Sequence, residues 1–289
     1  MTVRRLRLAA LVVAAGLAGS VAAHAQTLGF GQTGDAPIHI EADNGIEWQR
    51  DKQLYLARGN ARASQGESTV EGDELIAYYR ENATGDNEIY RLDAVGHVRV
   101  LSRSEVATGD RAIYDVLNGV LVMTGERVRL ETAQDTIEAR DSLEYYEKRR
   151  LAVARGDALA IRADRRLKAD ILMAHFVDAQ AGASRPAAGK GATKSEPAAR
   201  DAALDRIEAV GNVLISTPTD IVIAERGDYD LKTGLAQLTG GVKITRGETQ
   251  LNGERAEVNL NTGRSRLLSG GERVKGVFLP KAAPTGDNR

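Results

Sequence analysis

Apolar and polar residues alternate with a period of two along most of this sequence. The pattern begins after Pro37, where Ile38, Ile40 and Ala42 are separated by polar residues. Alternation of this kind is typical of a β-strand with one buried face. It recurs in segments 53–57, 98–101, 120–123, 127–131, 158–162, 213–216, 234–238, 242–245, 257–260 and 273–279. The sequence therefore predicts an all-β fold.

Glycine-containing pairs between the predicted strands indicate hairpin turns. The candidates are Asn118-Gly119, Thr233-Gly234, Asn252-Gly253 and Thr262-Gly263. Segment 133–148 has enough Glu, Ala and Arg for a helix, but its place in an internal repeat assigns it to strands.

The chain contains a long internal repeat. Residues 91–98, RLDAVGHV, return 115 residues later as RIEAVGNV at 206–213, and the same offset holds for about sixty further residues. Within this repeat, glycines recur at 59, 96, 125, 156, 211, 240 and 271, mostly with spacings near 30. A period of this length is typical of an array that stacks one small unit on the next. We therefore expect an open-ended stack of antiparallel strands built from units of about 30 residues.

One segment interrupts the repeat. Residues 179–204 are rich in Ala, Gly, Ser, Pro and Lys, a composition that buries too little apolar surface to order itself. We expect a disordered insertion between a first part of the β-fold, 26–178, and a second part, 205–280, with a domain boundary as the alternative. Residues 281–289 are expected to form a flexible tail.

Each unit also carries an acidic residue and, a few residues later, an aromatic one. The acids are Asp43, Asp73, Asp110, Asp141, Asp170 and Glu225. The aromatics are Trp48, Tyr78, Tyr114, Tyr145, Phe176 and Tyr229. A column of carboxylates fits metal sites or catalysts, but acids that cap turns or face solvent at a sheet border are far more common. The aromatic column fits a core better than a ligand platform.

The N-terminus has the features of a cleavable signal peptide, residues 1–25. Arginines precede an apolar run from Leu8 to Ala23, and Ala23-His24-Ala25 matches an A-x-A cleavage site. A retained membrane anchor is the alternative, although the run is short for a membrane span. We expect an exported protein whose mature chain begins near Gln26.

Composition limits the possible chemistry. The chain has no cysteine, which excludes thiol catalysis and disulfides, and His39, His97 and His175 lie far apart in the sequence. The formal net charge is −1, and basic residues are spread among acids, so we expect no nucleic-acid partner. No nucleotide motif is present and no cofactor or metal is expected. A catalytic pair of carboxylates contributed by distant strands remains an open alternative.

A hydrophobic content of 42% with only 4% aromatics predicts an interior of Val, Ile, Leu and Ala. An open stack exposes unpaired backbone groups at its end strands, which favours the addition of another chain. Its interior also opens at both ends. Such an interior suits acyl chains, because each CH₂ group removed from water gains about 0.8 kcal/mol.

Several motifs resemble those of the LptA/OstA family of periplasmic lipopolysaccharide-transport proteins. They are PIHIEAD at 37–43, GNARASQG at 59–66, EGDELIAYY at 71–79, LTGGVKI at 238–244, NGERAEV at 252–258 and GERVKGVFLP at 271–280. The resemblance covers nearly the whole mature chain. It implies a twisted, open-ended β-jellyroll in the periplasm, without enzymatic activity, that encloses the acyl chains of lipid A during transport from the inner to the outer membrane.

The resemblance also implies sites and partners. It places groove contacts at Ile38, Ile40, Tyr229 and Leu231, and the internal repeat extends them to Tyr114 and Val116. The expected groove also includes Val98, Val100, Val213 and Ile215. Expected edge residues for head-to-tail self-association are Ile38, His39, Val274, Val277 and Leu279. The implied partners are lipopolysaccharide, an inner-membrane-anchored LptC-like protein and an outer-membrane LptD-like assembly protein.

This chain departs from the family by about 115 additional residues. The extra copy either lengthens one groove or forms a second jellyroll. Two other function classes remain open: a structural adaptor that joins envelope partners through sheet edges without carrying lipid, and a secreted enzyme acting on polysaccharides. The enzyme reading requires acids or histidines clustered on one face.

Overall fold

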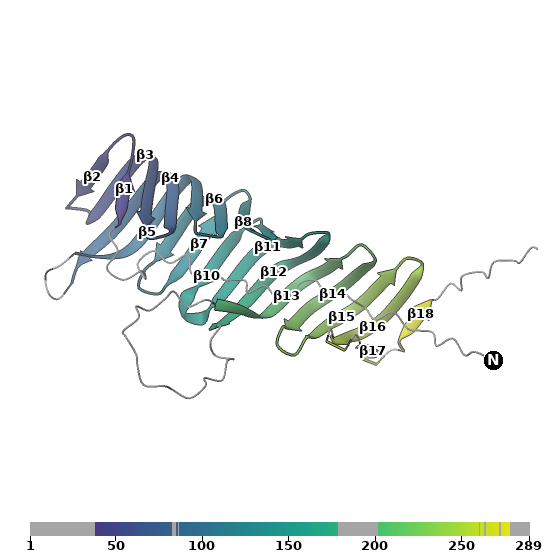
Figure 1. Ribbon diagram of the computed structural model, residues 1–289. Coiled ribbons are helices and arrows are strands. Elements are labelled where there is room, and N and C mark those ends of the chain that lie inside the picture. The colour runs from purple at the N-terminus through teal and green to yellow at the C-terminus, as the bar shows by residue number, and fades with distance from the viewer. Residues whose placement is uncertain are drawn as a thin grey trace, which may run out of the picture.

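The computed structural model describes residues 38–82, 85, 87–178, 202–259, 261–262, 264–271 and 273–277. These residues form an 18-stranded sheet in which all pairings are antiparallel. Consecutive long strands lie side by side, so the sheet is a long twisted ribbon from β1 to β18 (Figure 1). The all-β, antiparallel and open-ended architecture expected from the sequence is confirmed.

The strands are β1 (His39–Glu41), β2 (Ile46–Gln49), β3 (Leu54–Gln65), β4 (Ser68–Glu81), β5 (Asn87–Leu101), β6 (Glu105–Asp115), β7 (Val120–Thr124), β8 (Val128–Thr132), β9 (Asp135–Ala139), β10 (Ser142–Tyr146), β11 (Leu151–Arg162), β12 (Arg165–Asp178), β13 (Ala202–Ser216), β14 (Asp220–Asp230), β15 (Leu235–Arg246), β16 (Thr249–Asn259), β17 (Arg264–Leu268) and β18 (Lys275–Val277). In the described residues, no helix has the length and apolarity that a membrane crossing requires.

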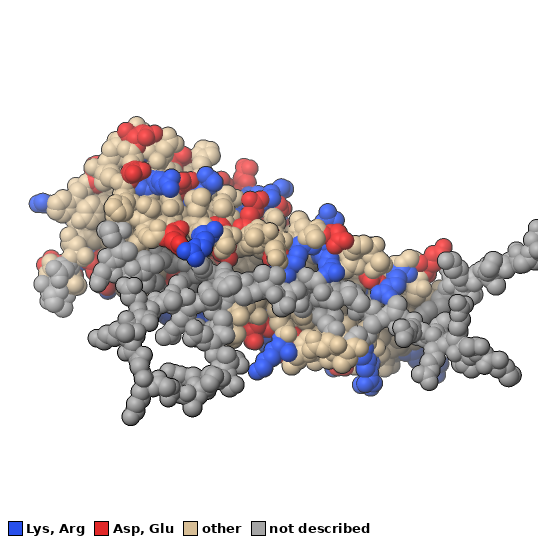
Figure 2. Space-filling model, in the orientation of Figure 1, with Lys and Arg blue, Asp and Glu red and all other residues tan. Residues whose placement is uncertain are grey.

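The outer surface carries charges of both signs along its length (Figure 2). Many of these charges face each other across neighbouring strands, as in the ladder formed by Arg62, Glu71 and Arg99 on β3, β4 and β5. These groups are solvent-exposed or half-buried, so each pair contributes little to stability. Their effect is to keep the outer face of the sheet polar while the inner face is apolar.

Most long strands bend near their middle at a glycine. In β5 the pairing with β6 is interrupted between Val95 and Val98, where Gly96 and His97 both have positive φ, +75° and +47°. The same register break with two left-handed residues occurs at 59–60 in β3, 156–157 in β11, 211–212 in β13 and 240–241 in β15. Bulges with a left-handed glycine bend a strand sharply. These corners divide the ribbon into two halves that pack against each other. Half-sheet A contains β1, residues 61–65 of β3 and 98–101 of β5, with the segments paired to them, and half-sheet B contains β2, residues 54–58 of β3 and 91–95 of β5, with the segments paired to those.

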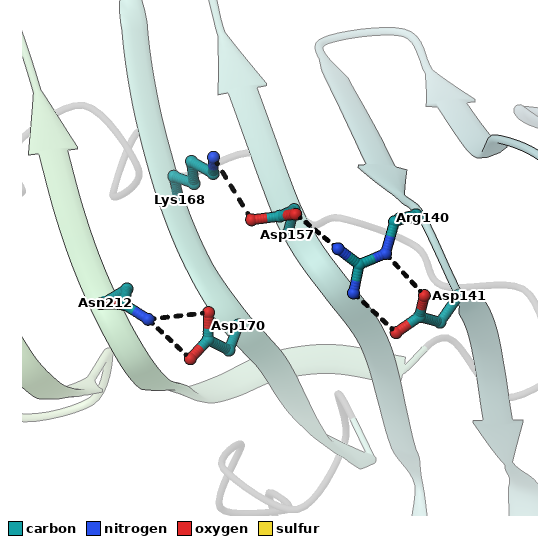
Figure 3. Close-up of polar contacts among 6 residues, drawn as sticks. All are labelled: Arg140, Asp141, Asp157, Lys168, Asp170 and Asn212. Carbon is teal, nitrogen blue, oxygen red and sulfur yellow. Dashed lines mark hydrogen bonds and ion pairs between the residues drawn. The ribbon is translucent and has the colours of Figure 1, made fainter.

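The acid of each repeat lies against the glycine corner of a neighbouring strand. Asp73 accepts a hydrogen bond from His97 Nδ1 at 2.9 Å, and Asp170 accepts two from Asn212 Nδ2 at 3.0 and 3.1 Å. At the corner of β11, Arg140 joins Asp141 to Asp157, and Lys168 joins the same network (Figure 3). A Cβ added at Gly211 would lie 2.1 Å from an Asp170 oxygen. The acids therefore occupy turn-supporting positions, which was the commoner interpretation of their spacing.

The two copies of the repeat share one sheet and one continuous interior. The core of the first copy contains Val98, Val100 and Val128, and that of the second contains Val213 and Val242. Leu143 of β10 packs against both. The extra copy therefore extends the same stack, which the sequence left open.

Some local predictions were wrong. Asn252-Gly253 is not a turn but lies within β16, where Gly253 faces Val242 and leaves room for Leu267, whose Cγ lies 2.7 Å from the place of a Cβ. Asn118-Gly119 and Thr233-Gly234 do lie between paired strands, and 133–148 does form strands apart from the start of a 3-10 turn at Glu147–Arg149. Thr262 lies in the turn between β16 and β17, but Gly263 lies outside the described residues.

The terminal segments and the insertion lie mainly outside the described residues. This applies to the expected signal peptide, to the tail 281–289 and to 179–201 of the expected insertion. The strands that flank this last stretch, β12 and β13, pair directly with each other as far as Asp178 and Ala202. The described sheet therefore continues directly from β12 to β13, and residues 202–204 of the expected insertion belong to β13.

Candidate functional site

The inner faces of the two folded halves form an apolar space that we call the trough. Half-sheet A carries one continuous inner row across paired strands, which includes Ala63, Val70, Val100 and Ala107. Half-sheet B carries a facing row that includes Ala57, Leu75, Ala94 and Ala112. Corresponding aliphatic rows continue through the second copy, for example Ile215, Val222 and Ile244 in half-sheet A. The trough therefore runs along the length of the ribbon.

Polar residues lie along the end of half-sheet A that is away from the corners, at the next inward-facing position beyond the aliphatic row. Asp220 on β14 is 2% exposed and accepts hydrogen bonds from Arg246 of β15 at 2.5 and 3.0 Å. Asp135 of β9 pairs with Arg162 of β11 in the same way. Burial alone would raise the pKa of Asp220, but the hydrogen bonds from Arg246 and Thr219 outweigh it and lower that pKa. These ion pairs lie at the rim of the trough and join neighbouring strands of half-sheet A.

A cavity of about 80 Å³ lies in the trough at its N-terminal end. It is lined mainly by apolar side chains, among them Ile38, Ile40, Ile46, Val100 and Leu121. The first three belong to the edge of the ribbon and are 39%, 39% and 53% exposed. The trough is therefore unsealed at this end, and its opening is apolar.

Aromatic rings gather at the same end, where Trp48 of the predicted set meets two tyrosines that the prediction did not include. Trp48 stacks on Tyr55 with ring centroids 5.8 Å apart, and Tyr55 contacts Tyr79 at 5.1 Å. Tyr78 instead packs beside Tyr90 and under the guanidinium of Arg91. Strand alternation explains the difference, because it turns Ala77 and Tyr79 inward and Tyr78 outward. The predicted single column of aromatics was wrong at Tyr78.

The expected groove residues of the first copy occupy different depths. Ile38, Ile40, Val100 and Tyr114 line the cavity. Val98 is 1% exposed in the row beside the corner, and Val116 packs against the same core cluster. These positions share the inner face of the trough.

The expected residues of the second copy also lie inside. Val213 is 1% exposed, Ile215 packs against the same core, Tyr229 is 7% exposed and Leu231 is half-buried. The two repeated tyrosines differ in their hydroxyls: Tyr114 donates to Glu147 Oε1 at 2.9 Å, whereas Tyr229 Oη is buried and has no partner among the described residues. Burial, with a smaller contribution from the Asp230 charge, raises the pKa of Tyr229.

The expected edge residues lie at the two ends of the ribbon. Ile38 precedes β1 and His39 begins it. Val274 precedes β18 and is 41% exposed, and Val277 ends β18 and is 58% exposed. Each end consists of two short strands, one on each half-sheet: β1 and β2 pair with β3, and β17 and β18 pair with β16. Leu279 lies outside the described residues.

Sequence reasoning missed Glu105 and Ser102, which lie at the rim of half-sheet A in the first copy. The Ser102 amide donates to the Glu105 carbonyl at 2.9 Å across a tight turn. Glu105 precedes Ala107 by two positions and therefore faces inward, where burial raises the pKa of its carboxyl to about 7. The repeated spacing of Ser or Thr three residues before an acid, at 102, 132 and 217, was the signal available in the sequence.

Metal or catalytic clusters are not evident in the part of the chain that the structure describes. No group of three or more His, Asp or Glu side chains there is placed to hold a metal ion. His39, His97 and His175 belong to three separate strands, β1, β5 and β12. The arrangement offers a long apolar surface along the trough.

Comparison with protein families gives two matches to one family. The family described as "LptA/(LptD N-terminal domain) LPS transport protein" matches residues 39–141 and again residues 136–264, one match for each copy of the repeat. An uncharacterized protein of Rhizobium meliloti (strain 1021) is 26% identical over 131 residues, which is 44% of this chain and 69% of that protein. The solved structure of LptH, the LptA-homologous periplasmic component of the lipopolysaccharide transport device of Pseudomonas aeruginosa, is 18% identical, covers 42% of this chain and 83% of its own, and has a TM-score of 0.36.

Proposed function

Because the chain belongs to the LptA/LptD N-terminal domain family of lipopolysaccharide transport proteins, we propose that it is a periplasmic, non-enzymatic carrier whose trough encloses the acyl chains of lipid A. The single observation that carries this proposal is the apolar trough, which is unsealed at its N-terminal end and continuous through both copies.

The energetics favour an acyl guest. The cavity residues are almost all aliphatic or aromatic, so an alkyl chain placed among them leaves water at about 0.8 kcal/mol per CH₂ group. The cavity itself is short, and a whole acyl chain therefore requires the half-sheets to separate. The halves are continuous through the corners and otherwise meet through side chains, so opening costs packing rather than sheet hydrogen bonds.

We further infer that the free ends serve as contact surfaces for assembly. Exposed apolar residues at both ends, including Ile46, Trp48 and Val277, accompany strands with an unpaired edge. Such edges accept a further strand in register. Head-to-tail self-association, with an LptC-like protein at the β1–β2 end and an LptD-like protein at the β17–β18 end, would build a bridge between the membranes.

Photo-crosslinking in cells that make lipopolysaccharide tests the carrier proposal. A photoreactive amino acid at Ile40 or at Tyr229 should capture lipopolysaccharide, because both side chains lie on the inner face. The adjacent positions Glu41 and Asp228 are matched controls, since neighbouring residues of a strand point to opposite faces. Absence of lipid at both inner positions would reject transport through the trough and leave the adaptor function as the better account.

A further inference from the structure

Three hairpins at the rim of half-sheet A have the same residue spacing, but one of them lacks two contacts that the other two share. Each places a Ser or Thr three residues before an acid: Ser102 with Glu105, Thr132 with Asp135, and Thr217 with Asp220. In the second and third, the Thr hydroxyl accepts the amide of the acid at 2.9 Å, and the acid pairs with an arginine on the neighbouring strand.

The first hairpin lacks both contacts. Ser102 Oγ is buried without a partner among the described residues. Glu105 has the same place in the first copy as Asp220 in the second, 115 residues later, but the residue paired with it on the next strand is Thr132 rather than an arginine. Within the described part of the chain, two polar groups of one turn are thus unpaired at the rim of the trough.

Among the described residues, no arginine, lysine or histidine forms an ion pair with Glu105. Arg103 in the same turn pairs with Glu67, and Arg129 on β8 pairs with Glu131 and Glu138. Burial is the main cause of the raised pKa of Tyr145, followed by the Glu147 charge, by Arg150 in the opposite sense and last by Glu105, so the Tyr145 hydroxyl is within range of the Glu105 carboxyl. Burial without a compensating charge favours the neutral carboxyl.

We propose that Glu105 and Ser102 form a polar subsite at the rim of the trough, which hydrogen-bonds an ester, amide or hydroxyl oxygen of the bound lipid. The inference rests on the proposed carrier function and names the chemical groups of the lipid that the subsite would bind. A neutral acid is a donor as well as an acceptor, and Ser102 Oγ can take either role. A plain hydrocarbon segment would leave both groups unsatisfied, so the subsite fixes where along the trough a polar linkage of the lipid rests.

The test is binding of purified lipid A to the full mature chain between pH 6 and pH 8. Wild-type affinity should fall about tenfold over this range, because the binding-competent, protonated fraction falls. Glu105→Gln keeps a donor and should bind equally at both pH values, whereas Glu105→Leu should bind more weakly than wild type at pH 6. Both variants meet the same lipid at the same pH, so titration of the lipid itself cancels. Glu131→Gln, exposed on the outer face, should behave as wild type.

A lipid-free measurement examines the carboxyl directly. Between pH 4.5 and about 7 the folded Glu105 retains a proton that the unfolded chain has released, so wild-type stability should fall as pH rises through this window. The difference in stability between wild type and Glu105→Gln should change over the same window and become constant above it. A constant difference from pH 4.5 to 8 would overturn the neutral carboxyl and with it the subsite.

The outcomes separate the two proposals. Wild-type binding that matches Glu105→Leu at every pH would overturn the subsite and leave the carrier function standing. Tighter wild-type binding at pH 8 than at pH 6, lost in Glu105→Gln, would mean that Glu105 takes a cation instead. Failure of wild type to bind lipid A at any pH would overturn the carrier function, and the lipid assignment of the subsite with it.

Discussion

Tyr114 and Tyr229 occupy equivalent places in the two copies but differ in what their hydroxyls contact. Both rings are nearly buried on the inner face. Tyr114 donates to Glu147 at 2.9 Å, and burial, followed by the nearby Glu147 carboxylate, raises its pKa. Tyr229 Oη has no partner among the described residues. A buried hydroxyl without a partner retains the cost of leaving water, so the second copy keeps a polar group available to a guest.

The two tyrosines should therefore respond differently to loss of the hydroxyl. Tyr114→Phe leaves the Glu147 oxygen without its donor and should lower the free energy of unfolding by about 1–3 kcal/mol. Tyr229→Phe removes an unsatisfied group and should change it by less than about 0.5 kcal/mol or raise it. Urea denaturation of the lipid-free protein measures both. Equal losses would show that Tyr229 has a hydrogen bond in solution.

At this scale, sequence reasoning identified residue types better than residue neighbours. Alternation was enough to place Ile40 and Val100 on the inner face, because a strand has only two faces. It did not place Tyr55 against Trp48, or Glu105 against Thr132, because those contacts depend on the register between strands. Register is set by the bulges and by the packing of the whole sheet.

The strands at the two ends of the ribbon differ from those inside it. β1, β2, β17 and β18 have three to five residues each, whereas β3 to β6 have eleven to fifteen. Short end strands limit indiscriminate edge pairing. Because each half-sheet ends in its own short strand, a second copy would meet this edge at two places, one for each half of the trough.

Val277→Pro should weaken end-to-end association. Proline removes an amide that could pair with an added strand and fits poorly inside a sheet, while Val277 is exposed and belongs to neither interior core. Sedimentation at increasing protein concentration should show a lower average mass than wild type. Val277→Thr retains the amide and the branched side chain and is the matched control. Equal masses for the proline and threonine variants would mean that association does not use β18.

Elements were predicted well where turn chemistry and repeat agreed. Asn118-Gly119 lies between β6 and β7, and the repeat correctly overruled the helix-like composition of 133–148 for most of that segment. The hairpin turn predicted at Asn252-Gly253 was wrong, because glycine has two roles in this fold. It permits tight turns, and it also leaves space where Leu267 approaches the backbone of β16.

The described residues enclose one extended apolar trough, along which the repeated sequence forms two successive copies of the same strand arrangement. Its repeat, its strands and its open ends followed from periodicity alone. The continuity between copies did not, because the sequence contains no direct sign that Leu143 packs against both cores. Both copies match the lipopolysaccharide transport family, and the two matches overlap at residues 136–141, in β9 and the corner just before β10.

Capture of lipid at this junction tests the continuous trough most directly. A photoreactive residue at Leu143, with its outward neighbour Glu144 as control, should be examined beside Ile40 in cells that make lipopolysaccharide. The account predicts lipopolysaccharide bound at Leu143 and Ile40 and none at Glu144. Capture at Ile40 with none at Leu143 would contradict it, because the lipid would then stop within the first copy.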